Sequence, residues 1–282
     1  MIPYVELSGW VFLARDSLAT GMPPMDLAVR PFGTLVALGV YLAGYITVLR
    51  ARQRGVSDRL MTSFLLWVAG SGFVFGHVLD TLMYYPEEAL RDPWSVLRLW
   101  EGLSSFGGFI GGVFGAVLWR THYGTPAFVY ADLMASCFPL GFMIGRVGCA
   151  VVHDHPGIAS EAWYAVDFPQ GGMLDLGLLE VMALCPLVIG FAIAWRTPKP
   201  WGFYLGVMSV AYAPVRFSLD FLRRRDGYFS DVRYAELTPA QWGSCALLIV
   251  GAFIYLRAMT MASFASPTLS RRGSSRSFKS AT

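Results

Sequence analysis

Long apolar segments recur along almost the whole of this 282-residue chain, and they restrict it to one class of fold. A helix needs about 20 apolar residues to cross the bilayer core, and such stretches recur from Phe32 to Tyr255 with no long polar region between them. Hydrophobic residues make up 55% of the chain, and the mean hydropathy of +0.50 is higher than a water-soluble domain of this length normally shows. The sequence therefore predicts an all-α, polytopic membrane protein.

Seven segments are long and apolar enough to be predicted as membrane-spanning helices. They are residues 32–49, 60–83, 103–119, 126–152, 176–195, 202–221 and 241–256. We therefore predict one transmembrane domain over residues 32–256. Residues 1–31 lack the basic start and the cleavage site of a signal peptide, and we expect a retained, interfacial segment. Residues 257–282 are basic and rich in serine, which predicts a disordered tail.

The distribution of lysine and arginine predicts how the chain is oriented, because these residues are enriched in cytoplasmic loops. Of the 22 basic residues, twelve fall on one side of the predicted spans and eight on the other. The larger group is Arg50, Arg52, Arg54, Arg59, Arg120, Arg196, Lys199, Arg257, Arg271, Arg272, Arg276 and Lys279. We expect the N-terminus outside and the C-terminus in the cytoplasm, with the lipid bilayer and no nucleic acid as partner.

Two sets of small residues are interpreted as packing residues. Cys137, Cys149, Cys185 and Cys245 stand singly in apolar segments, without the paired spacing of a disulfide scaffold or a zinc site. No metal and no other cofactor is therefore expected. In the third span, glycines recur at intervals of four, which lets a second helix approach closely. These glycines are Gly107, Gly111 and Gly115, with Gly108 and Gly112 beside them.

The two remaining basic residues, Arg146 and Arg216, lie inside predicted spans, where a central arginine costs roughly 2.5 to 3.5 kcal/mol. In the predicted topology, both arginines and His77 lie roughly 8 to 9 Å below the outer end of their span, at 1.5 Å per residue. Three such groups at one depth predict a shared polar cavity open toward the outer leaflet.

The three groups differ in whether an acidic residue lies three or four positions away on the same helix. Asp80 follows His77 by three residues and Asp220 follows Arg216 by four, so each pair shares a helical face and an ion pair is the structural alternative. Arg146 has no acid at such a spacing, and its unmatched charge predicts an external anion. Because a guanidinium donates two parallel hydrogen bonds to phosphate, we expect a lipid phosphate there, with the Tyr212 hydroxyl in the same cavity.

Four motifs in a fixed order resemble those of the prolipoprotein diacylglyceryl transferases, bacterial inner-membrane enzymes with seven transmembrane helices. They are residues 30–33 (RPFG), 101–108 (EGLSSFGG), 145–148 (GRVG) and 216–226 (RFSLDFLRRRD). The resemblance extends from Arg30 to about Tyr255. It implies transfer of diacylglyceryl from phosphatidylglycerol to the thiol of a lipobox cysteine in a secreted prolipoprotein, with release of glycerol phosphate, and location in the bacterial inner membrane.

The resemblance also implies roles for individual residues. Arg146 and Arg216 match the family's essential arginines and are expected to hold the phosphate and to stabilise the charge of the leaving group. Gly107 and Gly108 are expected to contact the phospholipid. The supporting residues are expected to be Tyr212, Asp220, Asp154, His77 and His153.

Four positions depart from the family pattern. Phe106 stands in place of a histidine and can neither accept the thiol proton nor donate to a phosphate, while Cys149 replaces an asparagine, Phe32 a tyrosine and His77 an arginine. A general base near neutral pH contributes roughly 10² to 10⁴-fold to the rate of such a reaction. Its function is expected to have moved to His77, His153 or His155, although the latter two also fit a solvated loop.

Two alternatives follow from these departures. A noncatalytic phospholipid-binding protein would keep the phosphate pocket but lack the base because of Phe106. A metal-dependent intramembrane enzyme would use side chains of the types that suit zinc. These side chains are His77, Asp80, His153, Asp154 and His155.

Overall fold

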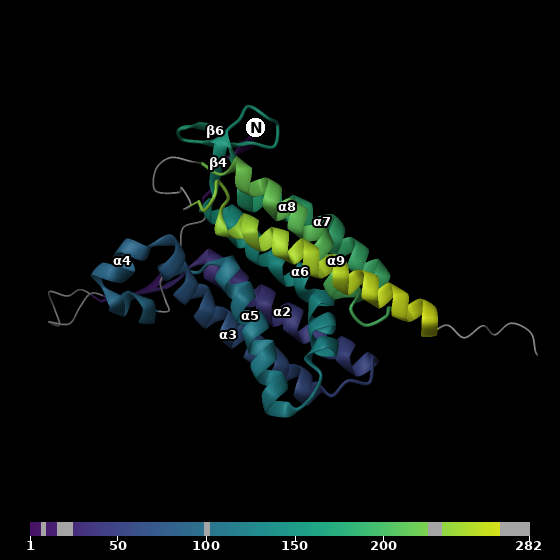
Figure 1. Ribbon diagram of the computed structural model, residues 1–282. Coiled ribbons are helices and arrows are strands. Elements are labelled where there is room, and N and C mark those ends of the chain that lie inside the picture. Colours follow the sequence, from purple (N-terminus) through teal and green to yellow (C-terminus); the bar gives the residue numbers. More distant parts are fainter. Residues whose placement is uncertain (7–9, 16–24, 99–101, 225–232, 266–282) are drawn as a thin grey trace, which may run out of the picture.

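Seven long helices form a bundle in the part of the chain that the computed structural model describes, residues 1–6, 10–15, 25–98, 102–224 and 233–265 (Figure 1). They are α2 (Pro31–Gln53), α3 (Asp58–Tyr84), α5 (Ser105–Tyr123), α6 (Ala127–Val152), α7 (Leu176–Ala194), α8 (Phe203–Leu219) and α9 (Pro239–Ala265). Each corresponds to one predicted span, and six of them, all except α5, are long and apolar enough to cross a membrane. The predicted all-α, polytopic fold is confirmed.

Local sequence signals explain where several helices begin and end. Pro31 is the first residue of α2, a position that suits proline because the first helical N–H groups have no partner within the helix. Gly124 ends α5 in the left-handed conformation, with φ of 63°. Helix α9 continues to Ala265, so residues 257–265 are helical although the sequence predicted a disordered tail from residue 257. The rest of that tail, residues 266–282, lies outside the described residues.

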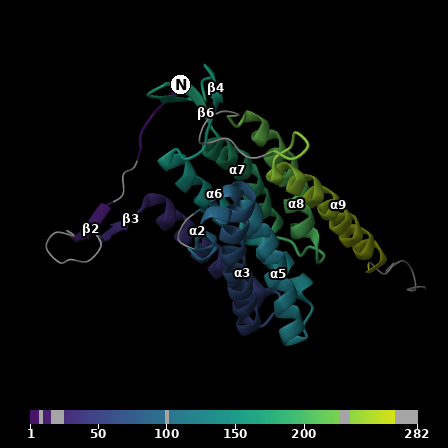
Figure 2. The same ribbon diagram turned by 60° about the vertical axis from the view of Figure 1, so that its left-hand side comes forward.

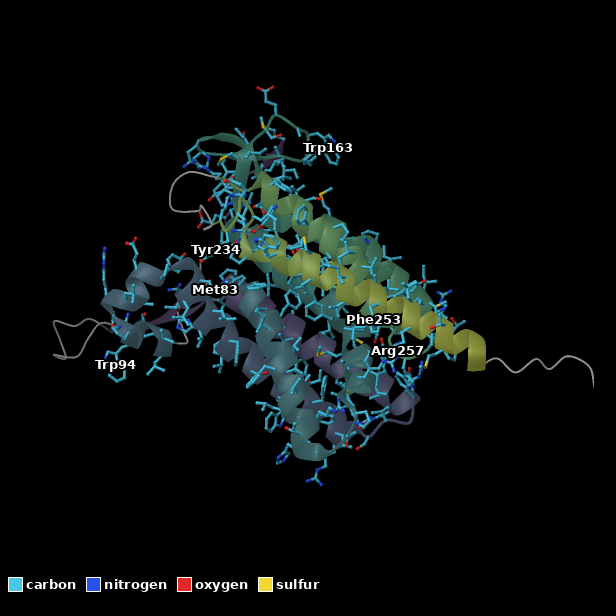
Figure 3. All side chains as sticks on the ribbon, viewed as in Figure 1. Met83, Trp94, Trp163, Tyr234, Phe253 and Arg257 are labelled. Carbon is cyan, nitrogen blue, oxygen red and sulfur yellow. The ribbon has the colours of Figure 1, made fainter. Side chains whose placement is uncertain are left out.

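Large apolar side chains point away from the bundle. Leu66, Val113, Ile249 and Phe253 are each at least 65% exposed, and Figure 3 shows Phe253 projecting from α9. In water such a surface would be strongly unfavourable, whereas lipid chains cover it in a bilayer. The chain is therefore a multi-pass membrane protein. The side of the membrane on which each terminus lies stays a prediction.

Helix α6 lies at the centre of the bundle. Helices α2 and α7 both pack against it, α3 packs against α5, and α8 packs against α9 and α6. Figures 1 and 2 show α7, α8 and α9 on one side of α6, with α2, α3 and α5 on the other. Residues that α6 directs toward α7 and α8 therefore lie at the junction between the two groups of helices.

The glycine row of α5 forms its contact with α3, as the sequence predicted. A Cβ added at Gly107 would lie 2.6 Å from the carbonyl oxygen of Phe75, and one added at Gly111 would lie 2.4 Å from that of Ser71. These distances leave no room for a side chain, so the backbones of the two helices meet directly.

Two small sheets, which we did not predict from the sequence, lie outside the long helices. The four-stranded sheet has the order β1-β5-β6-β4, and the second is a hairpin of β2 and β3. The strands are β1 (Ile2–Pro3), β2 (Trp10–Arg15), β3 (Met25–Val29), β4 (Pro156–Ala159), β5 (Val166–Phe168) and β6 (Gly171–Asp175). Part of the predicted interfacial segment thus pairs with the loop between α6 and α7, and Trp163 marks this end of the molecule in Figure 3.

The remaining elements are short. Helix α4 (Pro86–Arg91) and the 3-10 helix η1 (Pro93–Leu97) follow α3, and the 3-10 helix η2 (Asp220–Leu222) follows α8.

Candidate functional site

A buried ion pair joins α6 to α7 near the end of the bundle that carries the four-stranded sheet. Nε of Arg146 lies 2.9 Å from Oε2 of Glu180, and both residues are buried. The prediction that Arg146 lacks an acidic partner is therefore wrong, because the partner belongs to another helix. Glu180 was not among the predicted site residues, although it is the single charged residue in the apolar span 176–195 and such a position signals a functional or paired group.

Tyr212 of α8 extends this ion pair into a network of three helices. Its hydroxyl donates a hydrogen bond to Oε1 of Glu180, as expected for a side chain that points into the polar centre. Nε of Arg146 is close to the carboxylate but not aligned with it for a hydrogen bond. Nη1 of the same guanidinium lies 3.6 Å from Sγ of Cys149, and its Cζ lies 5.1 Å from the centroid of the Phe142 ring.

The second arginine belongs to a cluster at the end of α8. Nη1 of Arg216 lies 3.0 Å from Oδ1 of Asp220, the ion pair that their spacing of four residues allowed as the structural alternative. The same oxygen lies 3.1 Å from Nε of Arg223, and the other carboxylate oxygen accepts a hydrogen bond from the Thr238 hydroxyl. Asp220 is fully buried and thereby ties α8 to the beginning of α9.

The two arginines belong to neighbouring polar groups, because Tyr212, which bonds to the Glu180 partner of Arg146, precedes Arg216 by four residues on α8. They are only 7% and 8% exposed. Their contacts within the described residues engage only part of the five N–H donors of each guanidinium, so donors remain for a phosphate ester. The arrangement is thus a pair of cations with internal carboxylates, in a site shielded from water.

His77 lies away from this network, near the end of α3, where it contacts the segment between α3 and α5. Its Nδ1 and Nε2 each lie 3.0 Å from a backbone carbonyl oxygen, those of Gly102 and Ser95. None of its contacts in the described residues reaches Arg146 or Arg216. The prediction that all three groups line one cavity is therefore not supported for His77, and equal depth in the membrane did not imply proximity.

The contacts of His153 also indicate a structural role. Its Nδ1 lies 2.6 Å from Oδ2 of Asp175, the residue that caps α7 by accepting a hydrogen bond from the N–H of Leu178. The imidazole stacks on Tyr4, with ring centroids 4.6 Å apart, and meets Phe168 edge-on. These contacts join the end of α6 to α7 and to the N-terminal segment.

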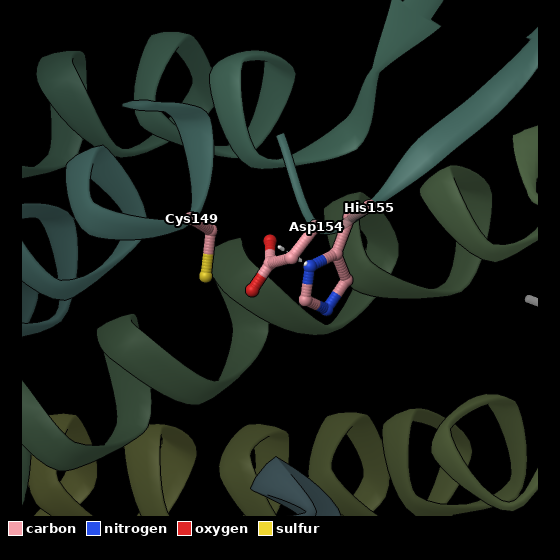
Figure 4. A group of neighbouring side chains, drawn as sticks. All are labelled: Cys149, Asp154 and His155. Atoms are coloured by element: carbon pink, nitrogen blue, oxygen red, sulfur yellow. Dashed lines mark hydrogen bonds and ion pairs between the residues drawn. The ribbon is translucent and has the colours of Figure 1, made fainter. Parts of the chain in front are cut away.

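Asp154 and His155 face the end of α6 and meet Cys149 there (Figure 4). The Asp154 carboxylate bonds to Nδ1 of His155, and one ligand-type atom from each of the three residues lies within 4.8 Å of the others. The group of five metal ligands considered from the sequence is therefore wrong, because its members do not all lie together. His77 and His153 are held by other groups, whereas Cys149, which we expected to serve in packing, belongs to the cluster.

Three residues of the glycine-rich motif 101–108 lie at helix contacts. The ring of Phe106 packs against α9, where a Cβ added at Gly243 would lie 2.6 Å from its Cε2. Gly107 is buried against α3, so the structure gives no support for its predicted contact with a phospholipid. Gly108 lies beside it, with the carbonyl oxygen of Gly72 at 3.8 Å from an added Cβ.

An apolar groove between α7 and α8 leads toward the Tyr212 side of this network. Its volume is about 350 Å³. The lining residues are Ala183, Leu184, Pro186, Leu187, Ala211, Tyr212 and Val215. Pro186 and Ala211 are exposed while Leu184 and Tyr212 are buried, so the groove connects the lipid-facing surface with the interior.

Comparison with known proteins gives a consistent family match over most of the chain. A family model described as prolipoprotein diacylglyceryl transferase matches residues 22–257. A relative from Aeromonas hydrophila named phosphatidylglycerol–prolipoprotein diacylglyceryl transferase is 28% identical over 87% of this chain and 91% of its own length. Relatives with the same name from Vibrio parahaemolyticus and Nitrosomonas europaea are 31% and 29% identical, over 71% and 84% of this chain and 76% and 87% of their own lengths.

Proposed function

The chain belongs to the prolipoprotein diacylglyceryl transferase family, and on that premise we propose that it moves diacylglyceryl from phosphatidylglycerol to the thiol of a lipobox cysteine in a prolipoprotein. The enzyme acts in the bacterial inner membrane, with its C-terminus in the cytoplasm. The observation that carries this proposal is the buried network in which Tyr212, on the same helix as Arg216, bonds to Glu180, the partner of Arg146.

The reaction requires a charge to be stabilised where it develops. The acceptor thiol gives its proton to water, and its sulfur bonds to the terminal glycerol carbon of the diacylglyceryl group as the bond from that carbon to the phosphate oxygen breaks. The electron pair leaves on glycerol phosphate, whose negative charge increases. Two guanidinium groups already fixed in a shielded site stabilise this charge without reorganising, and Arg146 and Arg216 have this role.

The internal carboxylates keep these cations in place before substrate binds. An unpaired arginine would be costly at this depth, and Glu180 and Asp220 offset much of that cost. Tyr212 in turn fixes the Glu180 carboxylate. A bound phosphodiester takes the free N–H donors of both arginines, while the carboxylates hold the guanidinium planes.

The groove between α7 and α8 provides a place for the lipid chain. Its lining is apolar, it reaches the lipid-facing surface, and it ends at Tyr212, which bonds to the partner of Arg146. An acyl chain in this groove would remain in an apolar environment while its headgroup reaches the arginines.

Transfer to a peptide tests the function directly. Purified protein is incubated with phosphatidylglycerol and a synthetic lipobox peptide, and the mass of the peptide is measured. We expect the peptide to gain one diacylglyceryl group, and a peptide with alanine in place of its cysteine to remain unchanged. Unmodified cysteine peptide, under conditions in which a family member modifies it, would contradict the proposal.

The packing of Phe106 against Gly243 favours one alternative, a phospholipid-binding protein without turnover. A phenylalanine ring held between helices supplies no base, so the phosphate pocket could be retained without the reaction. This alternative predicts binding of phosphatidylglycerol without peptide modification. It further predicts that Phe106→His confers transfer on a protein that otherwise shows none.

A further inference from the structure

The cluster of Cys149, Asp154 and His155 has the composition of a transition-metal site. Cys149 lies in the last turns of α6 and is buried, and the two other side chains follow that helix and are 36% and 27% exposed. Sulfur, carboxylate oxygen and imidazole nitrogen thus face one another at the boundary between the bundle and the loop (Figure 4).

We propose that Cys149, Asp154 and His155 bind a divalent transition-metal ion of the zinc class. Zinc takes thiolate, imidazole and carboxylate ligands at about 2.0 to 2.3 Å, and its catalytic sites have three protein ligands and one open position. Thiolate and imidazole ligands disfavour magnesium and calcium, which prefer oxygen donors. The metal would take the place of the hydrogen bond between Nδ1 of His155 and the Asp154 carboxylate.

The geometry needs only a small adjustment. The three donor atoms lie within 4.8 Å of one another, and a tetrahedral zinc ion would draw the sulfur closer and separate the hydrogen-bonded Asp154 oxygen from Nδ1 of His155, given its usual bond lengths. The partly exposed side chains of Asp154 and His155 lie outside the long helices, so they can turn toward the buried sulfur. The cluster is therefore close to a binding geometry without any change in α6.

The surrounding charges are compatible with a bound dication. A thiolate and a carboxylate together carry the two negative charges that balance it. Nη1 of Arg146 lies 3.6 Å from the sulfur, and the charge of this guanidinium is already paired with Glu180.

The other histidines have different environments. His77 contacts backbone carbonyls, His153 bonds to Asp175, and His122 stacks on Trp67 in the last turn of α5. Among the described residues, His155 is thus the histidine placed to complete a site with Cys149.

The role of this metal rests on the proposed function. The open position would take the acceptor thiol, which gives its proton to water and binds as a thiolate. That sulfur then attacks the glycerol carbon, the carbon–oxygen bond breaks, and glycerol phosphate leaves with the electron pair while the metal stays divalent. The metal would thereby supply the thiol activation that Phe106 cannot provide.

Metal content and a cobalt spectrum test the site independently of activity. Full-length protein is dialysed against Zn²⁺ or Co²⁺, separated from free metal and analysed by mass spectrometry. We expect one equivalent of zinc and a thiolate-to-cobalt charge-transfer band for the wild type and for the control Cys185→Ser. Cys149→Asn, which introduces the family residue, and His155→Gln should bind at least tenfold more weakly and lack the band. Wild-type protein without zinc, or Cys149→Asn with wild-type affinity, would overturn the proposal.

Thiol alkylation of the wild type avoids the question of whether a variant folds. Zinc should slow alkylation of Cys149 at least tenfold but leave the exposed Cys185 unaffected, as measured by peptide mapping. Equal rates for Cys149 with and without zinc would contradict the proposed ligand. Peptide transfer that persists after verified removal of the metal would refute its role in the reaction. Metal binding without transfer would instead refute the proposed function and leave the site intact.

Discussion

Glu180 on α7 lies 2.9 Å from Arg146 on α6 and thereby pairs an arginine that has no acidic neighbour along its own helix. The pair is buried at the junction of the two helix groups, next to the Tyr212 hydroxyl. Because the pair is buried, a substitution of either residue changes the stability of the fold as well as the site. Variants that test the reaction must therefore be compared with controls for stability.

Loss of both members of this pair should cost less stability than the sum of the two single losses. Arg146→Ala leaves the Glu180 carboxylate buried without its cation, and we expect a loss of about 3 to 5 kcal/mol in the free energy of unfolding. The double variant Arg146→Ala/Glu180→Ala should lose less than the sum of the two single changes. The double-mutant cycle is measured by unfolding the wild type, the two single variants and the double variant in the same detergent, monitored by intrinsic fluorescence. Additive effects would show that the two side chains do not interact.

Arg216→Lys should separate chemistry from folding. Lysine retains the positive charge opposite Asp220 but loses the planar, bidentate donor geometry of the guanidinium. We expect the rate of peptide modification to fall roughly 100-fold, with little change in unfolding temperature. The exposed Arg120→Lys on α5 serves as the matched control and should retain the wild-type rate. Full activity of Arg216→Lys would remove Arg216 from the proposed mechanism.

Filling the groove between α7 and α8 should impair use of long-chain substrate. Ala211 is an exposed lining residue, and Ala211→Trp would occupy much of the space beside Tyr212. We expect KM for phosphatidylglycerol with long acyl chains to rise, with a smaller effect for short chains. Ile249→Trp, at a 71% exposed position on α9, controls for a bulky group on the lipid-facing surface. An equal change for both chain lengths would place the acyl chain outside this groove.

Gly111→Ala should destabilise the contact of α5 with α3. The added Cβ would lie 2.4 Å from the carbonyl oxygen of Ser71 and 2.5 Å from Cβ of Phe75, so the helices must move apart. We expect a loss of about 1 to 3 kcal/mol in the free energy of unfolding, as for other overpacked sites. Gly190→Ala on α7, where an added Cβ meets nothing within 4 Å, should have little effect. Similar unfolding temperatures for both variants would contradict the assigned contact.

The sequence by itself determined the features that depend on residues close along the chain. Apolar length predicted the helices, a spacing of four residues predicted the pair of Arg216 and Asp220, and the glycine row predicted a close helix contact. Each of these follows from the rise and periodicity of a single helix, which are the same in every fold.

Only the tertiary structure decided which helix faces meet. Glu180 approaches Arg146 because α6 packs against α7. His153 and His155 take different partners although they lie two residues apart, because the chain after α6 enters the four-stranded sheet. Cys149 likewise meets Asp154 and His155 only because the chain folds back over the end of α6. A helix periodicity gives the direction of a side chain relative to its own axis, whereas its partner depends on the packing of other helices, which no local pattern contains.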